Sequence, residues 1–132
     1  MGALSNYLEE AVLNHVFRNI ALGSPATTYL ALYTTDPGEA DAGVEVSGGA
    51  YARQAVTFGA PSQVGGKATI KNSVEIVFPV ATADWGLIVF VGVRDTLTVG
   101  NLLYYGPMTV QKTINNTDQL KFAVDALVLD LD

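Results

Sequence analysis

The chain has 132 residues, of which 49% are hydrophobic and 15% are charged, with 13 acidic residues, 7 basic residues and no cysteine. This length favours a single domain over residues 1–132, and so hydrophobic a composition excludes a disordered protein. The net charge of −6 argues against a nucleic-acid groove, which needs clustered Lys and Arg, and the lack of cysteine excludes thiol catalysis and thiolate zinc sites.

The low share of charged residues has a further implication. Soluble domains usually devote about a quarter of their residues to charge. The sequence therefore predicts apolar surface that is buried against copies of the chain or against a partner. The N-terminus lacks the basic region of a signal peptide, and the longest apolar run, Gly86–Val93, is far shorter than the roughly 20 residues of a membrane helix. We therefore expect neither export by a cleaved signal nor a membrane anchor.

One helix is predicted, over residues 5–22. Asn6 or Ser5 can cap its N-terminus, and Glu9 follows Asn6 at the spacing of a capping box. Residues 23–25, Gly-Ser-Pro, are expected to end it.

The apolar arc of this helix is wide. At 100° per residue the only polar stripe is narrow, and the lone histidine, His15, lies in the middle of the apolar arc. A helix lying on one sheet needs a narrower arc, so we expect this helix to be covered on two sides. The apolar positions that define the arc include Leu8, Val12, Val16 and Phe17.

Residues 27–132 read as β structure. Tyr29–Thr34 is rich in strand-forming residues, and Gly86–Val93 is a continuous apolar run of the kind found in strands buried on both faces. Two segments that flank Asn72-Ser73 predict a hairpin. Gly and Pro recur every 10–15 residues, which favours an antiparallel β-sandwich or a partly open barrel with one N-terminal helix. The further strands are expected at 51–58, 68–70, 74–78, 102–105, 108–114 and 120–131.

The last of these strands changes phase. Leu120, Phe122 and Val124 alternate with other residues, but Leu127 and the two leucines after it fall in the opposite parity. An extra residue in a strand has this effect, so the pattern predicts a β-bulge near Asp125-Ala126. Asp130 and Asp132 are then expected to face solvent.

A long connection over residues 35–50 is acidic. It contains Asp36, Glu39, Asp41 and Glu45 and no basic residue. Grouped carboxylates can bind calcium, but their spacing matches no EF-hand, and a solvated acidic loop is the alternative. We predict no metal and no cofactor. The glycine pairs of the chain, Gly48-Gly49 and Gly65-Gly66, predict turns with positive φ rather than a phosphate-binding loop.

No catalytic constellation is visible in the sequence. His15 is better explained as a packed or interface residue than as a general base, and no serine lies in a nucleophile elbow. Trp85 precedes the apolar run and is expected to close one end of the core, with sugar binding as the alternative. The sequence therefore predicts a protein that is not an enzyme.

Several phrases of the sequence resemble a family of small tailed-bacteriophage virion proteins, whose members are described as tail fibre, minor tail or head decoration proteins. The similarity covers nearly the whole chain and contains no catalytic signature. The phrases are residues 4–8, 28–37, 45–60, 72–79, 85–86, 100–106 and 112–114.

The resemblance implies a virion structural protein made in the host cytoplasm. It favours a capsid decoration protein, most simply a homotrimer, that binds the major capsid protein on the capsid exterior and cements the lattice; a tail-tip or tail-fibre-associated structural or adhesion protein is the alternative. No nucleic-acid or membrane partner is expected. Arg53 is expected to pair with a carboxylate. The residues expected at the interface are Leu8, Val12, Val16, Phe17, Arg53 and Trp85.

Overall fold

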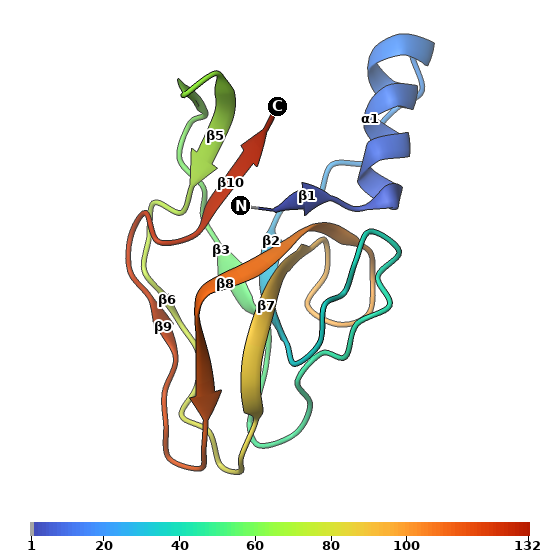
Figure 1. Ribbon diagram of the computed structural model, residues 1–132. Helices are drawn as coiled ribbons and strands as arrows, with labels where there is room; N and C mark the ends of the chain where they lie inside the picture. Colours follow the sequence, from blue (N-terminus) through green and yellow to red (C-terminus); the bar gives the residue numbers. More distant parts are fainter. Residues whose placement is uncertain (1) are drawn as a thin grey trace.

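The computed structural model describes residues 2–132 and is mainly β, with one helix and antiparallel sheets that do not close into a barrel (Figure 1). The predicted fold class is confirmed. The elements are β1 (Ala3–Leu4), α1 (Asn6–Arg18), β2 (Thr28–Tyr33), β3 (Gln54–Val56), β4 (Ser62–Val64), β5 (Lys67–Lys71), β6 (Ile76–Val77), β7 (Gly86–Arg94), β8 (Leu102–Ile114), β9 (Lys121–Phe122) and β10 (Val128–Leu131).

The largest sheet has the strand order β1-β8-β7-β2-β3, and β2 is its most deeply buried strand. Leu30 and Leu32 point to one face of the sheet, and Ala31 and Tyr33 point to the other. All four are at most 1% exposed, so both faces of β2 are covered. The strand predicted over Tyr29–Thr34 is confirmed within one residue.

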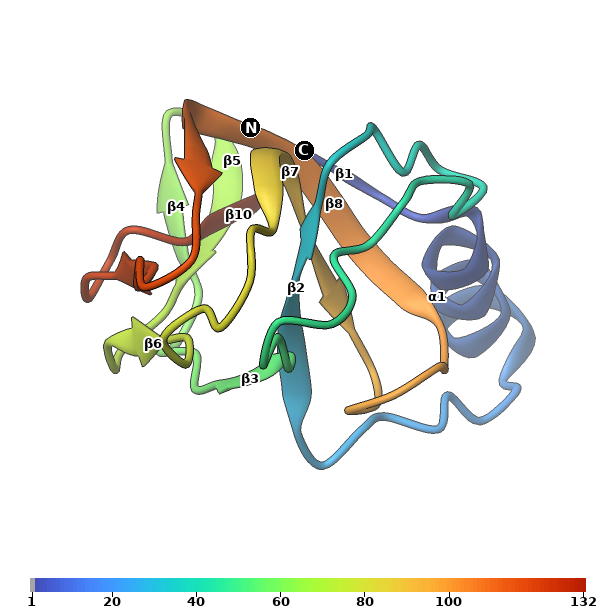
Figure 2. The ribbon, with the colours of Figure 1, turned by 90° about the horizontal axis from the view of Figure 1, so that it is seen from below.

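The main core lies between this sheet and the short β6–β9 pair. Seen from below, β6 and α1 lie on opposite sides of the large sheet (Figure 2). The second face is covered by the loops at residues 34–50 and 95–101, which lie on the same side as α1 (Figure 2). The buried members of the main core are Leu30, Leu32, Val46, Val56, Ile76, Phe78, Ala81, Trp85, Ile88, Ile114, Leu120 and Leu127.

The expectation for Gly86–Val93 is correct in part. The segment forms β7 in the middle of the large sheet, and Ile88 and Val93 are buried. Leu87, however, is 44% exposed. The prediction that β7 is buried on both faces is therefore wrong at its beginning, where one face of the sheet is uncovered.

Strand β8 is one strand where two were predicted, and it is sharply bent (Figure 1). Phe90 of β7 lies opposite Pro107, whereas Ile88 lies opposite Lys112. Residues 108–111 of β8 are therefore placed opposite the single residue Val89. Pro107 has no N–H to donate, so it marks a bend in the strand rather than its end.

The hairpin predicted around Asn72-Ser73 is wrong. β5 pairs with β4 through the turn at Gly65-Gly66, whose φ values are +58° and +83°, and its other edge pairs with β10. β6 pairs with β9 instead. Gly48 and Gly49 also have positive φ, so the turn prediction for both glycine pairs is confirmed.

The β-bulge predicted near Asp125-Ala126 is a turn. Asp125 has φ of +67°, and the chain leaves β9 there to join a different sheet as β10. A turn that changes sheets alters the parity of the pattern just as an inserted residue does. Asp130 is half-buried rather than solvent-facing, and its Oδ1 lies 3.2 Å from the Tyr104 hydroxyl.

Asn72 holds this corner together from the interior. Its side-chain amide donates to the carbonyl oxygens of Val74 (2.9 Å) and Ala123 (3.0 Å), and its Oδ1 accepts from the Leu127 N–H (2.9 Å). The residue is 0% exposed. One amide therefore joins the three segments that meet where β9 gives way to β10.

We predict that Asn72→Ala lowers the free energy of unfolding by about 3 kcal/mol, because each buried polar group left unpaired costs about 1–3 kcal/mol. Urea unfolding at constant m-value measures the change. Asn116→Ala, at an exposed asparagine, is the matched control and should leave the midpoint unchanged. Equal midpoints for the two variants would contradict the role given to Asn72.

Candidate functional site

Two features of the structure bear on function: the helix α1 and a pair of buried arginines behind the acidic loop. The base of α1 is firmly attached to the sheet. Ser5 is its N-cap, accepting a hydrogen bond from the Leu8 N–H at 3.2 Å, and its hydroxyl donates to the Leu102 carbonyl oxygen of β8. The Asn6 N–H also donates to the Glu39 carbonyl oxygen of the acidic loop, at 2.9 Å.

The helix is shorter than predicted. It ends at Arg18 rather than residue 22, because Asn19 takes a left-handed conformation with φ of +55° and its N–H returns to the Asn14 carbonyl oxygen. Asparagine tolerates this conformation better than most residues, so it stops the helix before the glycine and proline at residues 23–25. Ser5 is the cap rather than Asn6.

The apolar surface of α1 is divided into two faces. Leu8 and Val12 are half-buried on the side nearest the chain. Leu13 and Phe17 face away from that side and Val16 lies at the boundary between the two; they are 57%, 77% and 61% exposed. We call these three residues the outer face of α1. Within the chain α1 is therefore covered on one side, and cover of its second side stays a prediction.

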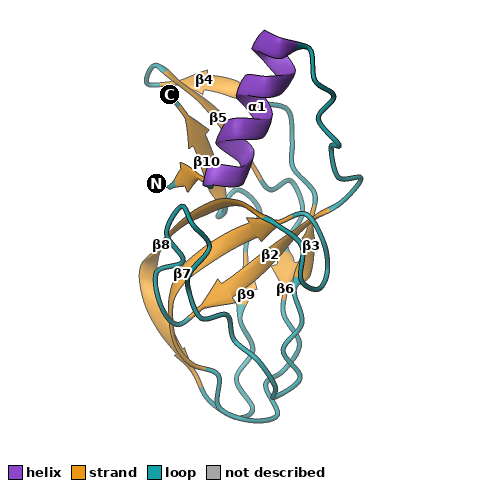
Figure 3. Ribbon diagram, turned by 90° about the vertical axis from the view of Figure 1, so that its right-hand side faces the viewer, coloured by secondary structure: helices purple, strands orange, loops and turns teal. Residues whose placement is uncertain are grey.

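The helix stands away from the β domain. It rises from the same end of the large sheet as the β4-β5-β10 sheet but apart from it, with its far end free of other elements (Figure 1 and Figure 3). His15 is exposed near that end, and its Nδ1 lies 3.2 Å from the Ile20 carbonyl oxygen. No residue of the main core belongs to α1.

Arg53 fastens two loops together. It is 8% exposed, and its guanidinium makes two contacts with the Glu45 carboxylate, at 2.7 and 2.8 Å. Its Nη1 donates to the carbonyl oxygens of Thr96 (2.9 Å) and Val99 (2.8 Å) in the loop after β7. The predicted pairing of Arg53 with a carboxylate is confirmed.

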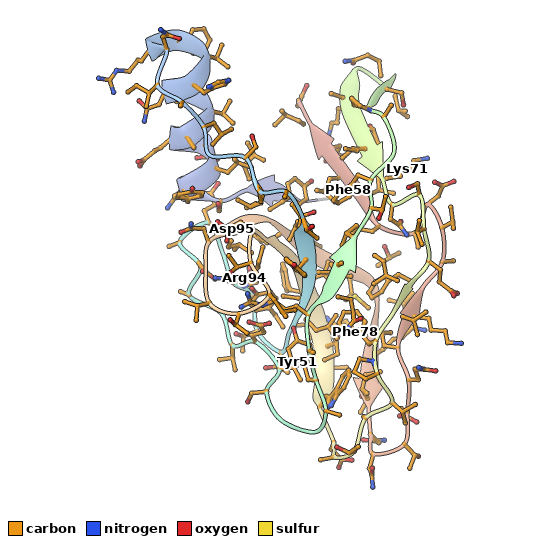
Figure 4. The ribbon with its side chains drawn as sticks, turned by 180° about the vertical axis from the view of Figure 1, so that it is seen from behind. Tyr51, Phe58, Lys71, Phe78, Arg94 and Asp95 are labelled. Atoms are coloured by element: carbon orange, nitrogen blue, oxygen red, sulfur yellow. The ribbon has the colours of Figure 1, made fainter. Side chains whose placement is uncertain are left out.

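Arg94, labelled in Figure 4, makes a second clamp through its two terminal nitrogens. Its guanidinium contacts both carboxylate oxygens of Asp41, at 2.8 and 2.9 Å, and donates to the Tyr33 hydroxyl and the Gly100 carbonyl oxygen. Bidentate pairs of this kind fix orientation as well as charge. Together the two clamps hold the acidic loop and the loop at 95–101 against the second face of β2.

The clamps alter the titration of the groups that they hold. Burial by itself would raise the pKa of Glu45, but hydrogen bonds from Arg53 and the Tyr51 hydroxyl outweigh it and lower that pKa below its ordinary value of 4.5. Burial, reinforced by the Glu45 carboxylate, raises the pKa of Tyr51. Tyr51 therefore stays protonated and donates to Glu45 at 2.6 Å.

The acidic loop is thus an ordered part of the fold. Two of its four carboxylates, Asp41 and Glu45, are paired with arginines. Within residues 2–132 no group of three or more His, Asp or Glu side chains is placed to hold a metal ion. The loop also returns beside β2, where Val46 donates to the Leu32 carbonyl oxygen at 3.0 Å.

Trp85 lies in the core, as one of its two interpretations predicted. It is 6% exposed, its Nε1 donates to the Gly49 carbonyl oxygen at 2.8 Å, and its ring meets Tyr51 edge-on at 5.5 Å. Tyr51 and Phe78 stack beside it with 6.2 Å between ring centres (Figure 4). Neither Trp85 nor Arg53 offers a surface to a partner, because both are buried.

The structure therefore separates the six residues expected at an interface. Val16 and Phe17 are exposed, Leu8 and Val12 lie toward the chain, and the remaining two are interior. Sequence analysis missed Arg94 and Asn72. The sequence does contain a sign of the role of Arg94. This arginine directly follows the apolar run of β7, and a charge at the end of a buried strand needs a buried partner.

The structure is thus a small β domain with one projecting helix whose apolar side chains are largely exposed. Residues 3–130 match the family described as podophage GP4 fiber I protein gp80. The chain belongs to this family, which confirms the resemblance to tailed-phage virion proteins. A comparison with curated proteins found no match. Within residues 2–132 no helix is long and apolar enough to cross a membrane.

We predict that the lowered pKa of Glu45 makes folding sensitive to acid. The ion pair stabilises the fold fully above pH 4.5, and this contribution is lost as the pH falls through the lower pKa of the folded state. In Glu45→Gln the free energy of unfolding should fall less steeply as the pH drops below 4.5, measured by urea unfolding. Glu75→Gln, which removes an exposed carboxylate outside α1, controls for net charge. A wild-type slope in Glu45→Gln would refute the prediction.

Proposed function

We propose that this chain is a structural subunit of a phage tail fibre, joined to copies of itself through α1. The observation that carries the proposal is the outer face of α1. Isolated apolar side chains on a surface are ordinary, but three on adjacent turns of a helix that projects from the domain form a patch typical of an interface.

The family supports the tail over the capsid exterior. Sequence analysis placed capsid decoration first and a tail-fibre role second. The family that the chain matches is described as a fibre protein, which favours the second. A structural family of this kind also suggests a role without catalysis. The net charge of −6 suits an external position better than contact with DNA.

The energy available from α1 limits how it can act. Full burial of a Leu, Val or Phe side chain contributes about 1.5–3 kcal/mol, whereas association costs about 4–15 kcal/mol in lost freedom. Burial of three side chains that are already partly covered therefore gives little net binding free energy in a single contact. Assembly of several copies, with the trimer expected from the resemblance as the simplest form, would make each contact support the others.

The number of copies in the particle tests the location. We expect this chain to be present at some tens of copies or fewer per purified virion, measured by quantitative mass spectrometry against the major capsid protein. Hundreds of copies would instead identify a capsid decoration protein and contradict the proposal.

The double variant Val16→Gln/Phe17→Gln tests the interface. Both side chains are more than 60% exposed and glutamine favours helices, so the fold should be retained while the oligomer is lost. Light scattering measures the molar mass, and circular dichroism confirms the fold. Val80→Gln, at a 48% exposed position outside α1, is the control and should leave the mass unchanged. An oligomer of unchanged mass in the double variant would exclude α1 as the interface.

A further inference from the structure

The β domain has a groove with both apolar and polar lining where its core is left open. The groove lies between the bent part of β8 and the segment that carries β9 and β10, and its volume is about 300 Å³. It exists because residues 108–111 of β8 leave the regular pairing with β7, so the two layers do not meet there. Its apolar lining includes Val91, Met108, Val110, Phe122, Leu127 and Leu129.

The groove is also basic. Lys112 of β8 and Lys121 of β9 both line it, and both are exposed. The chain has only seven basic residues, and two of them, Arg53 and Arg94, are used in the interior. The chain as a whole carries a net charge of −6, whereas the lining of this groove contains two lysines and no carboxylate and is therefore positively charged.

The outer side of α1 carries the complementary pattern. Glu9 and Glu10 lie in its first turns, on the same side of the helix as the outer face, and both are exposed. Read along that side, α1 presents two carboxylates and then Leu13, Val16 and Phe17. The groove offers apolar side chains for the apolar part of this surface and lysines for its two carboxylates, so the two surfaces are complementary in polarity and charge.

We propose that the outer side of α1 of one copy docks into the β8–β9–β10 groove of the next copy. This inference rests on the proposed function and names the surface that accepts the helix. Phe17 and Val16 would enter the apolar part of the groove, and Glu9 and Glu10 would face Lys112 and Lys121. Such a contact joins two different surfaces, so it forms a ring where the rotation between copies closes and a filament where it does not.

Within one chain these two surfaces do not meet. The hydrogen bonds of Ser5 fix the base of α1 on β8, the outer face is exposed, and no residue of α1 lines the groove. A parallel bundle of α1 helices from several copies is the alternative. That bundle would bring the Glu9 and Glu10 carboxylates of all copies together, whereas the groove offers them lysines.

The chain has no cysteine, which makes a direct test possible. Phe17→Cys and Val110→Cys are placed in separate copies that are coexpressed and oxidised, with different tags. Val110 lines the groove and is 65% exposed, so neither change disturbs the core. Disulfides require Cα atoms within about 7 Å, so only a seated helix gives the mixed dimer. We expect the mixed dimer as the main product, and Val80→Cys in place of Val110→Cys should abolish it.

Other products would overturn the docking in distinguishable ways. Dimers of Phe17→Cys with itself would show that α1 packs on α1, which refutes the groove and keeps the proposed function. No cross-link of either kind, together with a monomeric wild type in solution, would refute both.

Charge reversal gives a second measurement that does not depend on disulfide geometry alone. Glu10→Lys in the Phe17→Cys copy should slow cross-linking several-fold at low salt, and Lys121→Glu in the Val110→Cys copy should restore the rate. If the reversed pair does not recover, the orientation proposed for the helix is wrong and the docking is overturned.

Discussion

The arrangement of the molecule depends on the two guanidinium clamps behind β2. Arg53 and Arg94 each take one carboxylate from the acidic loop and carbonyl oxygens from the loop at 95–101. Replacement of a whole buried ion pair by apolar residues is often neutral, whereas loss of one partner is destabilising, so these clamps contribute geometry as well as stability. They specify where two long loops lie, and those loops give β2 its second covered face. Without that cover, Tyr33 and Ala31 would face water.

The same loops connect the interior to the helix. The Glu39 carbonyl oxygen of the clamped acidic loop accepts from the Asn6 N–H, beside the Ser5 cap on β8. The direction in which α1 leaves the domain is therefore set by loops that are themselves held by arginines. A projecting helix is useful in assembly only if its base is rigid, since a mobile arm would lose its conformational freedom on binding. The fold thus places its polar interactions at the root of α1 and its apolar residues at the exposed end.

Local patterns in the sequence predicted the elements better than their partners. The strand at Tyr29, the helix start and both glycine turns follow from propensity and turn chemistry. The end of α1 at Asn19 was missed because stronger breakers stand a few residues later. The pairing of β5 with β10 could not be predicted, because the two strands lie some 60 positions apart, and the short polar strand β4 on the other edge of β5 lacks a clear strand pattern. The Arg94–Asp41 clamp likewise joins residues 53 positions apart. The exposure of Val16 and Phe17 could not be predicted either, because an apolar helical face looks the same whether its own chain or a neighbour covers it.

Trp85 has one more consequence. It is the single tryptophan of the chain, and its indole is bonded to the Gly49 backbone and held edge-on against Tyr51, at the end of the acidic loop. Its emission is therefore a built-in optical reporter of that corner of the domain. Because α1 contributes nothing to the indole's surroundings, the signal distinguishes opening of the β domain from events confined to the helix. One buried ring thus separates folding from assembly without any added label.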